Sequence, residues 1–418
     1  MIRRVFVTGV GVLAPGGGDA PSFFSSLIGG RSSIGLLQSS FASRLTTRIA
    51  ASIDFDPKPH FPALRMTSLD RYAQFALVAA RQAVADAALA FDDELRERSG
   101  VFWGTGMGGA QTIEQGYNDV YLKGQDRVRP LSVPMSMNNA AAAQIGIEYG
   151  IRGPVLTYST ACASSANAVG EAFRAIRHGE IDLAVAGGSE ALLTFGALKA
   201  WEGLRALALE DAAEPAASCR PFSAERSGLV LGEGAGALVL ESEEHARARG
   251  ALPLAELVGY GRSNDATHLT KPAVDGQVRA MRQALLEAGL PAAAIGYLNA
   301  HGTATPVGDV VETAAIKEVF GAAAARLPVS STKSMHGHLM GAAGAVELIV
   351  ALMAMRSGSI PPTAHLRRPD PECDLDYVPN VARHGVAIDA VMSNSFAFGG
   401  GNAVLVLRRP EPHSHMPG

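Results

Sequence analysis

The sequence predicts an α/β fold built from two similar halves, and three observations support this prediction. Short apolar runs bounded by glycine alternate with longer alanine-rich stretches at helical spacing. The order of strands and helices starts again near residue 252, so the second half repeats the first. Gly accounts for 46 of 418 residues and charged residues for only 18%, which indicates a large interior packed with small side chains.

The first half, residues 1–250, alternates strands with helices. Its strands are short runs of β-branched or large apolar residues beside glycine, and we expect them at 5–9, 100–104, 155–159 and 183–186. Its main helices show apolar residues at helical spacing and are expected at 69–90 and 166–178. Gly179 closes the second helix, since glycine tolerates the left-handed backbone that ends many helices.

The second half, residues 251–411, restarts the alternation. We expect strands at 254–259 and 295–300, with a helix at 275–289 between them. Residues 412–418 contain proline and histidine without an apolar period, and we expect a loose tail there.

The most apolar long stretch, residues 341–355, is expected to be a core helix. It contains Glu347 and is shorter than the ~20 residues needed to span a bilayer. The N-terminus leads straight into a strand and has no signal-peptide pattern. We therefore expect a cytoplasmic protein without a membrane span.

Composition excludes several classes of protein. A hydrophobic content of 47% is too high for an intrinsically disordered chain. The net charge is 36 − 40 = −4, so no basic excess exists to neutralise nucleic-acid phosphates. Cys162, Cys219 and Cys373 are too few for a disulfide framework, which favours a reducing compartment.

Three short motifs match known functional signatures but lack the further features that those signatures require. Residues 9–14 match the dinucleotide fingerprint G-x-G-x-x-A, but no helix opens at these glycines and no acid follows ~20 residues later. Residues 330–333 contain S-x-x-K, yet the companion motifs of penicillin-binding enzymes are missing. His336 and His338 could bind a metal with His301, but no thiolate or carboxylate lies nearby at ligand spacing. We expect a turn at the glycines, no serine hydrolase and no metal.

Cys162 is the best candidate nucleophile. It lies where a β-branched strand breaks into small residues and a helix begins. The positive end of a helix dipole favours a thiolate, and small neighbours allow a substrate to approach the sulfur. Most isolated buried cysteines are inert, and Cys219 and Cys373 are interpreted in that way.

Two histidines and a lysine in the second half each lie at the end of a strand or before the start of a helix. His301 comes after the strand at 295–300, and Lys333 and His338 precede the Gly/Ala-rich helix. In α/β folds ligands gather at the carboxyl ends of strands. We therefore expect these side chains to converge with Cys162.

At this point the motifs resemble those of the β-ketoacyl-acyl carrier protein synthases, particularly the elongating type II enzymes and their polyketide-synthase relatives. The similarity runs from residue 5 to about residue 407. Its most specific motifs are Thr160-Ala-Cys162-Ala-Ser, Asn299-Ala-His301-Gly-Thr-Ala-Thr, Ser331-Thr-Lys333-Ser-Met-His-Gly-His338 and Asn394-Ser-Phe-Ala-Phe398-Gly-Gly. The resemblance implies a thiolase-like αβαβα five-layer fold made of two duplicated halves, and a homodimer.

The resemblance also implies a decarboxylative Claisen condensation. Cys162 would carry the acyl chain, and His301 and His338 would stabilise the enolate formed from malonyl-acyl carrier protein. The backbone N–H groups of Cys162 and Phe398 would form the oxyanion hole, and Lys333 would pair with Glu347. The product would be a 3-ketoacyl-acyl carrier protein and CO2, without a bound cofactor.

Binding residues are implied in the same way. The residues expected to contact pantetheine are Thr270, Thr303 and Thr305. Those expected to shape or gate the acyl pocket are Met107, Trp201, Phe398 and Gly399. Those expected to dock the acidic carrier protein are Arg65, Arg71, Arg127, Arg129 and Arg205.

Four positions depart from the usual family pattern. Ala397 replaces a glycine, Ser223 and Ser227 replace aspartates, and His336 replaces a threonine. A specialised polyketide or polyene pathway is therefore an alternative to housekeeping fatty-acid synthesis. A non-catalytic, chain-length-factor-like subunit of a heterodimer and a cysteine thioester hydrolase are the rival functions.

Overall fold

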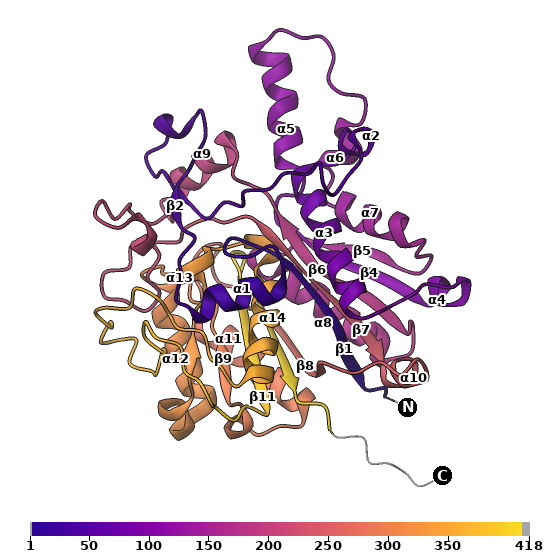
Figure 1. Cartoon of the computed structure of the whole chain (residues 1–418). Helices are drawn as coiled ribbons and strands as arrows, with labels where there is room; N and C mark the ends of the chain where they lie inside the picture. The colour runs from indigo at the N-terminus through magenta and orange to yellow at the C-terminus, as the bar shows by residue number, and fades with distance from the viewer. Residues whose placement is uncertain (1, 412–418) are drawn as a thin grey trace.

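A computed structural model of the chain describes residues 2–411, shown in Figure 1. The tail expected at 412–418 lies outside these residues. Five strands of the first half form one side of a ten-stranded mixed sheet. In spatial order they are β1 (Val5–Leu13), β7 (Gly234–Ser242), β6 (Leu183–Glu190), β4 (Ser99–Gly104) and β5 (Val155–Tyr158). β1, β7 and β6 pair antiparallel, whereas β6, β4 and β5 pair parallel.

The second half repeats this order and these directions. Its strands are β8 (Ala255–Asn264), β12 (Gly401–Arg408), β11 (Ala390–Phe396), β9 (Tyr297–Asn299) and β10 (Val329–Ser330). The first three again pair antiparallel and the last three parallel. The two halves meet where β1 pairs with β8, Val5 lying opposite Leu257. The duplication is therefore one of topology rather than of matching residues.

Helices cover and separate the two halves of the sheet in five layers (Figure 1). Helices α3 (Arg71–Asp86) and α7 (Ala140–Tyr149) pack on the outer face of the first half. Helices α8 (Ser164–Arg177) and α14 (Ala343–Ser357) lie between the halves and contact each other. Helices α11 (Val274–Ala288) and α12 (Gly308–Phe320) pack together, and α11 covers the outer face of the second half. This is the five-layer arrangement expected from the sequence.

The remaining elements are short. They are α1 (Ala20–Ile28), α2 (Ala63–Met66), α4 (Asp93–Glu97), α5 (Ala110–Tyr117), α6 (Ser132–Ser136), α9 (Phe195–Leu204), α10 (Glu243–Ala248), α13 (Lys333–His336), β2 (Gly35–Leu36) and β3 (Ile49–Ala50). A π-helical turn, Asn118–Leu122, extends α5, which projects away from the body of the molecule in Figure 1.

The expected helix boundaries differ from the observed ones by a few residues. The helix expected at 69–90 is α3, which begins after the N-cap Asp70 and ends before Ala88, whose φ is 46°. The helix expected at 166–178 begins two residues earlier, at Ser164. Sequence periodicity locates the body of a helix, whereas its ends depend on capping contacts.

The apolar stretch at 341–355 forms α14 in the core. The window 340–357 is apolar and long enough to cross a membrane by composition, but 83% of it is buried inside the fold.

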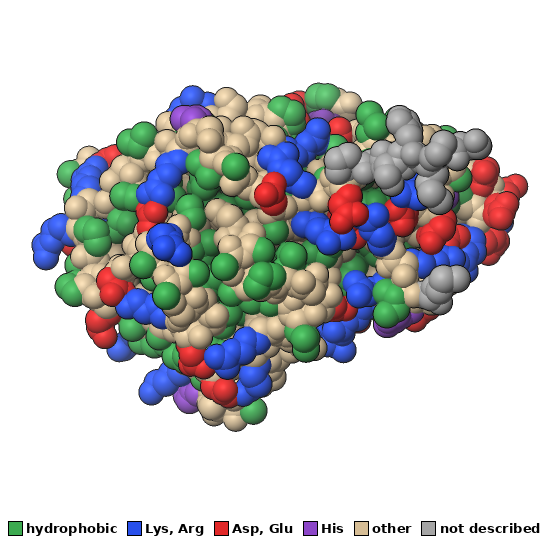
Figure 2. All heavy atoms as spheres, turned by 90° about the horizontal axis from the view of Figure 1, so that it is seen from below, with side chains coloured by type: hydrophobic (Ala, Val, Ile, Leu, Met, Phe, Trp, Pro, Cys, Tyr) green, Lys and Arg blue, Asp and Glu red, His purple; other side chains and the backbone are tan. Residues whose placement is uncertain are grey.

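The surface carries charges of both signs. Figure 2 shows Lys, Arg, Asp and Glu side chains interspersed with hydrophobic ones on one face of the molecule, consistent with the small net charge.

Candidate active site

Cys162 lies in a short 3-10 turn, Ala161–Ala163, between the end of β5 and the start of α8. Ala161 has a φ of 49°, so the backbone just before the cysteine is strained. The Ser164 hydroxyl accepts the N–H of Thr160 at 2.9 Å and donates to the carbonyl of Ala161 at 2.6 Å. These two bonds hold the sharp turn that places Cys162 at the N-terminal end of α8.

The Cys162 thiol is neutral at rest. Burial raises its pKa to about 12, while the Lys333 charge and the backbone N–H groups of Phe398 and Cys162 lower it. Burial therefore outweighs the helix terminus that was expected to favour a thiolate. The sequence shows where the helix begins but not how deeply the sulfur lies, with the residue only 4% exposed. A neighbouring base must take the proton.

His301 and His338 lie next to this thiol. His301 follows β9, and Glu312 in α12 accepts its backbone N–H at 2.9 Å. His338 follows α13, and its backbone N–H donates to the carbonyl of Val230 at 2.7 Å. The imidazole rings meet edge to face with centroids 5.3 Å apart. A nitrogen of each ring and the Cys162 sulfur all lie within 4.8 Å of one another.

Both imidazoles are neutral at pH 7. Burial, reinforced by the Lys333 charge, lowers the pKa of each well below the usual 6.5. The N–H of Met340 donates to His338 Nδ1 at 3.3 Å, so the ring proton resides on Nε2. That Nε2 and the Nδ1 of His301 are buried without a hydrogen-bond partner in the described part of the chain. Each ring therefore keeps one nitrogen free for a substrate.

Lys333 and Glu347 form a buried ion pair. Lys333 Nζ lies 2.5 Å from Glu347 Oε1, and both side chains are at most 1% exposed. Burial raises the pKa of Glu347 to about 7, whereas the lysine charge lowers it. The pair joins the core helix α14 to α13, the helix that leads to His338.

Glu190 was not singled out from the sequence, yet it holds two loops of the site together. At the end of β6 it accepts the backbone N–H groups of Gly106, Met107 and Gly341 at 2.7, 3.0 and 3.0 Å. These bonds join the loop after β4 to the segment that follows His338. Burial raises the pKa of Glu190 to about 7. The only sequence signal was an acid at the end of an otherwise apolar strand.

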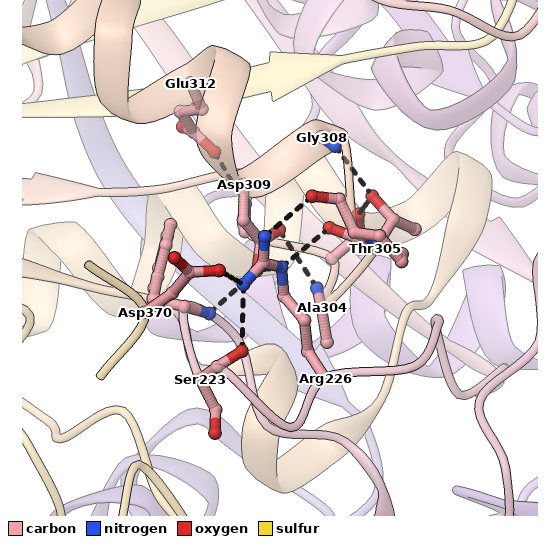
Figure 3. A network of polar contacts seen from close by, with 12 residues as sticks. Ser223, Arg226, Ala304, Thr305, Gly308, Asp309, Glu312 and Asp370 are labelled. Atoms are coloured by element: carbon pink, nitrogen blue, oxygen red, sulfur yellow. Dashed lines mark hydrogen bonds and ion pairs between the residues drawn. The ribbon is translucent and has the colours of Figure 1, made fainter. Parts of the chain in front are cut away.

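Asp309 plays a similar part near His301. It accepts the backbone N–H groups of Phe222 at 2.7 Å and Ala304 at 3.1 Å, and both residues have positive φ, 63° and 64°. Burial raises the pKa of Asp309 to about 7. Figure 3 shows it beside Arg226 and the loop that carries Ala304 and Thr305. The carboxylate thus stabilises a strained loop, which no local sequence pattern predicts.

The thiol of Cys162 and the imidazoles of His301 and His338 line one cavity of about 310 Å³. Its wall includes Cys162, His301 and His338, together with the four cavity-lining residues predicted for binding: Thr270, Thr303, Thr305 and Phe398. Thr303 is 8% exposed, and its hydroxyl lies 3.1 Å from that of Thr305. The thiol, both imidazoles and a pair of hydroxyls therefore face one cavity.

The other predicted gating residues lie around this cavity rather than in its wall. Trp201 in α9 stacks on Phe398, with ring centroids 5.9 Å apart and an angle of 26° between the planes. Gly399 has a φ of 86° and donates its N–H to the carbonyl of Leu269 at 2.7 Å. Met107 is 40% exposed, and its backbone N–H donates to the Glu190 carboxylate.

The five arginines predicted to dock a carrier protein differ in their surroundings. Arg65 is paired with Glu148 at 2.5 Å and Arg71 with Glu233 at 2.7 Å, so their charges are partly neutralised. Three others are exposed: Arg127, Arg129 and Arg205. Arg205 also lines the cavity. The exposed group is the better candidate for a docking surface.

The glycines of the fingerprint-like segment serve packing. A Cβ on Gly9 would lie 2.2 Å from the carbonyl oxygen of Ala83, and one on Gly11 would lie 2.0 Å from that of Ala79. Both glycines belong to β1, which packs closely on α3. No helix opens at them, in agreement with the rejection of a dinucleotide site.

The other rejected motifs are also accounted for. The Ser330 hydroxyl lies 2.8 Å from the hydroxyl of Tyr297, and Lys333 is committed to Glu347. His336 lies apart from the thiol–imidazole group, its Nε2 being 2.9 Å from Thr332 Oγ1. Cys219 and Cys373 are buried free thiols. The triad of Cys162 and the two histidines could geometrically hold a metal ion, but it faces the positive charge of Lys333.

Comparisons with known proteins agree with this geometry. Residues 2–246 match the Beta-ketoacyl synthase, N-terminal domain, and residues 254–367 match the Beta-ketoacyl synthase, C-terminal domain. Nodulation protein E of a Rhizobium species is 46% identical over 98% of this chain and 100% of its own. The 3-oxoacyl-[acyl-carrier-protein] synthase 2 of Staphylococcus aureus is 44% identical over 98% of this chain and 99% of its own.

Solved structures confirm the predicted fold class. A beta-ketoacyl synthase from Burkholderia phymatum superposes with a TM-score of 0.91 at 37% identity, covering 98% of this chain and 100% of that one. A type II polyketide ketosynthase, solved in complex with its acyl-carrier protein and bound to the hexaketide, has a TM-score of 0.90 at 33% identity with the same coverage. The chain belongs to the beta-ketoacyl synthase family and is an acyltransferase of the 3-oxoacyl-[acyl-carrier-protein] synthase class.

Proposed function

We propose that this enzyme lengthens an acyl chain by two carbons, with Cys162 as the nucleophile and His301 and His338 as the decarboxylating pair. One observation carries the proposal: a thiol and two neutral imidazoles meet within 4.8 Å in a single cavity. A cysteine hydrolase works with a Cys–His pair, so the second imidazole would have no catalytic role in it. A non-catalytic subunit has no use for the nucleophile.

In the first step the Cys162 sulfur attacks an acyl thioester on the pantetheine arm of an acyl carrier protein. The neutral imidazole of His301 accepts the thiol proton and returns it to the departing pantetheine thiol, because the Nδ1 lone pair of His338 already accepts the N–H of Met340. The carbonyl oxygen becomes negative during the attack. The N–H groups of Cys162 and Phe398, which point toward the sulfur, are suitably placed to stabilise that charge.

In the second step a malonyl-carrier protein occupies the same cavity. The free ring nitrogens of His301 and His338 hydrogen-bond the thioester oxygen, on which negative charge develops as CO2 leaves. A neutral imidazole can fill this role because it carries one N–H to donate to the oxygen. The Lys333–Glu347 pair supports the site, since burial lowers the pKa of both histidines and the lysine charge lowers it further.

In the third step the enolate carbon attacks the acyl-Cys162 carbonyl. A carbon–carbon bond forms, the carbon–sulfur bond to the cysteine breaks, and the thiolate regains a proton. The 3-ketoacyl chain leaves on the second carrier protein. The overall reaction consumes one proton and releases one CO2 and one free carrier thiol, and no bound cofactor takes part.

The carrier protein is the expected partner. Thr270, Thr303 and Thr305 are proposed to hydrogen-bond its pantetheine amides, and their position in the cavity wall supports this role. The exposed charges of Arg127, Arg129 and Arg205 suit an acidic carrier surface. Met107 and Trp201 are proposed to shape the acyl pocket, while Phe398 and Gly399 gate malonyl entry.

A homodimer is also proposed. β5 is the edge strand of the sheet, and its Leu156 is 45% exposed. The segment 113–137 exposes several large apolar side chains: Ile113, Tyr117, Val120, Tyr121, Leu122, Val128, Leu131, Val133 and Met137. An unpaired edge beside exposed apolar residues fits an interface. Light scattering of the purified protein should report twice the mass of 43.4 kDa. A monomer would favour a heterodimer with a related subunit.

The proposal retains the division near residue 250, with the nucleophile in residues 1–250 and the His and Lys residues in 251–411.

The proposal also places the enzyme in the cytoplasm. Fluorescent tagging with membrane fractionation would test that location. Recovery of the active protein in the membrane pellet would contradict it.

The function is tested with purified protein, acyl-carrier protein and malonyl-carrier protein. The expected products are CO2 and a 3-ketoacyl-carrier protein, and Cys162→Ala should form no ketoacyl product. Free acid without CO2 would support a hydrolase instead. Condensation that appears only after a related subunit is added, and that survives Cys162→Ala, would identify a non-catalytic partner.

A further inference from the structure

Arg226 is a buried arginine that takes no part in the reaction steps above. It lies in the segment before β7, and its side chain is only 5% exposed. Figure 3 shows its guanidinium group between Asp370 and the loop that carries Ala304 and Thr305. Burying a guanidinium is costly unless its donors are satisfied, so its contacts identify what it holds.

The donors of Arg226 reach main-chain carbonyls of the threonine loop. Nε donates to the carbonyl of Thr305 at 3.1 Å, and Nη2 donates to that of Pro306 at 2.7 Å. Nη1 donates to the carbonyl of Ser223 at 2.9 Å and to Asp370 Oδ2 at 2.5 Å. Burial alone would lower the pKa of Arg226, but the hydrogen bond to Asp370 and the nearby charges of Asp309 and Asp370 outweigh burial and raise the pKa. Only the planar fork of arginine can serve these acceptors together.

The same loop presents hydroxyls to the cavity. Thr305 Oγ1 accepts the N–H of Gly308 at 3.2 Å and lies 3.1 Å from Thr303 Oγ1. Ala304, between the two threonines, has a φ of 64°, so the loop needs external contacts to keep its shape. Arg226 therefore fixes the main chain of Thr305, while Gly308 fixes its side chain.

The charge of Arg226 is balanced by carboxylates and not by Ser223. The side chain of Ser223 donates to the carbonyl of Arg368 at 3.2 Å and carries no charge to pair with Arg226. Two carboxylates lie beside Arg226: Asp370 Oδ2 is 2.5 Å from Nη1, and Asp309 Oδ2 is 3.8 Å from Nε. Arg226 thus links three segments that are distant in sequence, 223–226, 305–309 and 370.

We propose that Arg226 is a positioning residue that orients the Thr303–Thr305 hydroxyl pair toward the amides of the pantetheine arm. The inference rests on the proposed function, because it assumes a pantetheine thioester in this cavity. Arg226 touches no reacting atom. It therefore sets how well the long arm binds and leaves the chemistry at Cys162 unchanged.

The test compares two substrates that share the thioester but differ in the arm. Acyl-pantetheine carries both amides, whereas an acyl N-acetylcysteamine thioester ends after the first. Transfer of the acyl group to Cys162 is followed by intact mass. Arg226→Gln should lower kcat/KM for acyl-pantetheine about tenfold, mainly through KM, since each misplaced hydrogen bond is worth roughly 1 kcal/mol. The rate with the short thioester should change less than about twofold.

Arg220→Gln is the matched control. Arg220 is also poorly exposed, at 14%, and is paired with Asp211, but it does not contact the threonine loop. Its substitution should leave the ratio of the two substrates unchanged. Arg226→Lys keeps the charge but cannot hold both carbonyls, so it should show an intermediate loss on acyl-pantetheine alone.

A double-mutant cycle with Thr305→Val identifies the route of the effect. If Arg226 acts through the Thr305 hydroxyl, Arg226→Lys should add little loss in the Thr305→Val background. Equal losses on both thioesters, or fully additive effects, would overturn the proposal. If the unmodified enzyme transfers no acyl group from either thioester, the proposed function fails, a result distinct from a failure of the Arg226 inference.

Discussion

Replacing His336 with threonine should make this protein less sensitive to acid. His336 is fully buried, its Nε2 lies 2.9 Å from Thr332 Oγ1, and its ring packs 5.7 Å from that of Phe23. Burial, with the Lys333 charge, lowers its pKa from 6.5 to about 3. The unfolded chain therefore binds this proton first as pH falls. The free energy of unfolding is lost from about pH 6.5 downward, until the folded protein is protonated near pH 3.

The magnitude follows from these two pKa values. Between about pH 7.5 and about pH 5, proton binding to one such histidine in the unfolded state removes about 2 kcal/mol of stability. His301, His338 and His365 have lowered pKa values as well and remain in the variant, so acid sensitivity should be reduced but not abolished. Any packing defect from the smaller threonine costs the same at both pH values and cancels in the difference.

Urea unfolding at the two pH values measures the effect. The loss of free energy of unfolding on acidification should be about 2 kcal/mol smaller in His336→Thr than in the parent protein. Substitution of the exposed His60 by threonine is the control and should leave the loss unchanged. An identical acid-induced loss in His336→Thr and the parent would refute the argument from burial.

Three further predictions concern the site itself. His338→Ala removes a donor to the developing enolate and should slow CO2 release from malonyl-carrier protein by roughly 10²–10³-fold; a loss below fivefold would speak against that role. Lys333→Met leaves Glu347 buried and unpaired, and it should lower the free energy of urea unfolding by about 3–5 kcal/mol. The double variant with Glu347→Leu should recover most of this loss. Purely additive losses would exclude coupling between the two residues. Met107→Gly should lengthen the acyl chains in the product profile, and unchanged chain lengths would remove Met107 from the acyl pocket.

Much of the fold could be predicted from the sequence because both halves show strong local patterns. Buried strands such as β6 are continuous runs of small and apolar residues, and α3 and α11 have a clear helical period. The spatial order of the strands in the sheet could not be predicted from these local patterns. The pairing of β1 with β8, which joins the halves, depends on contacts 252 residues apart, Val5 lying opposite Leu257.

The nucleophile and the two histidines could be predicted because Cys162 and His301 each follow a strand and lie among small residues, and because His338 precedes the Gly/Ala-rich helix α14. The carboxylates that hold their loops could not. Glu190 acts on the N–H groups of Gly106 and Gly341, which come together only in the folded sheet. The protonation state of Cys162 was also missed, since burial is a property of the whole fold and not of the local turn.

The central claim is that one acyl group passes through Cys162 and is consumed only by condensation. A single-turnover experiment tests it: the acyl-enzyme is formed, freed of donor, and mixed with malonyl-carrier protein while the intact mass, CO2 and products are followed together. The account predicts that the adduct on Cys162 disappears in step with equal amounts of CO2 and 3-ketoacyl-carrier protein. Loss of the adduct as free acid at the same rate with and without malonyl-carrier protein would contradict it.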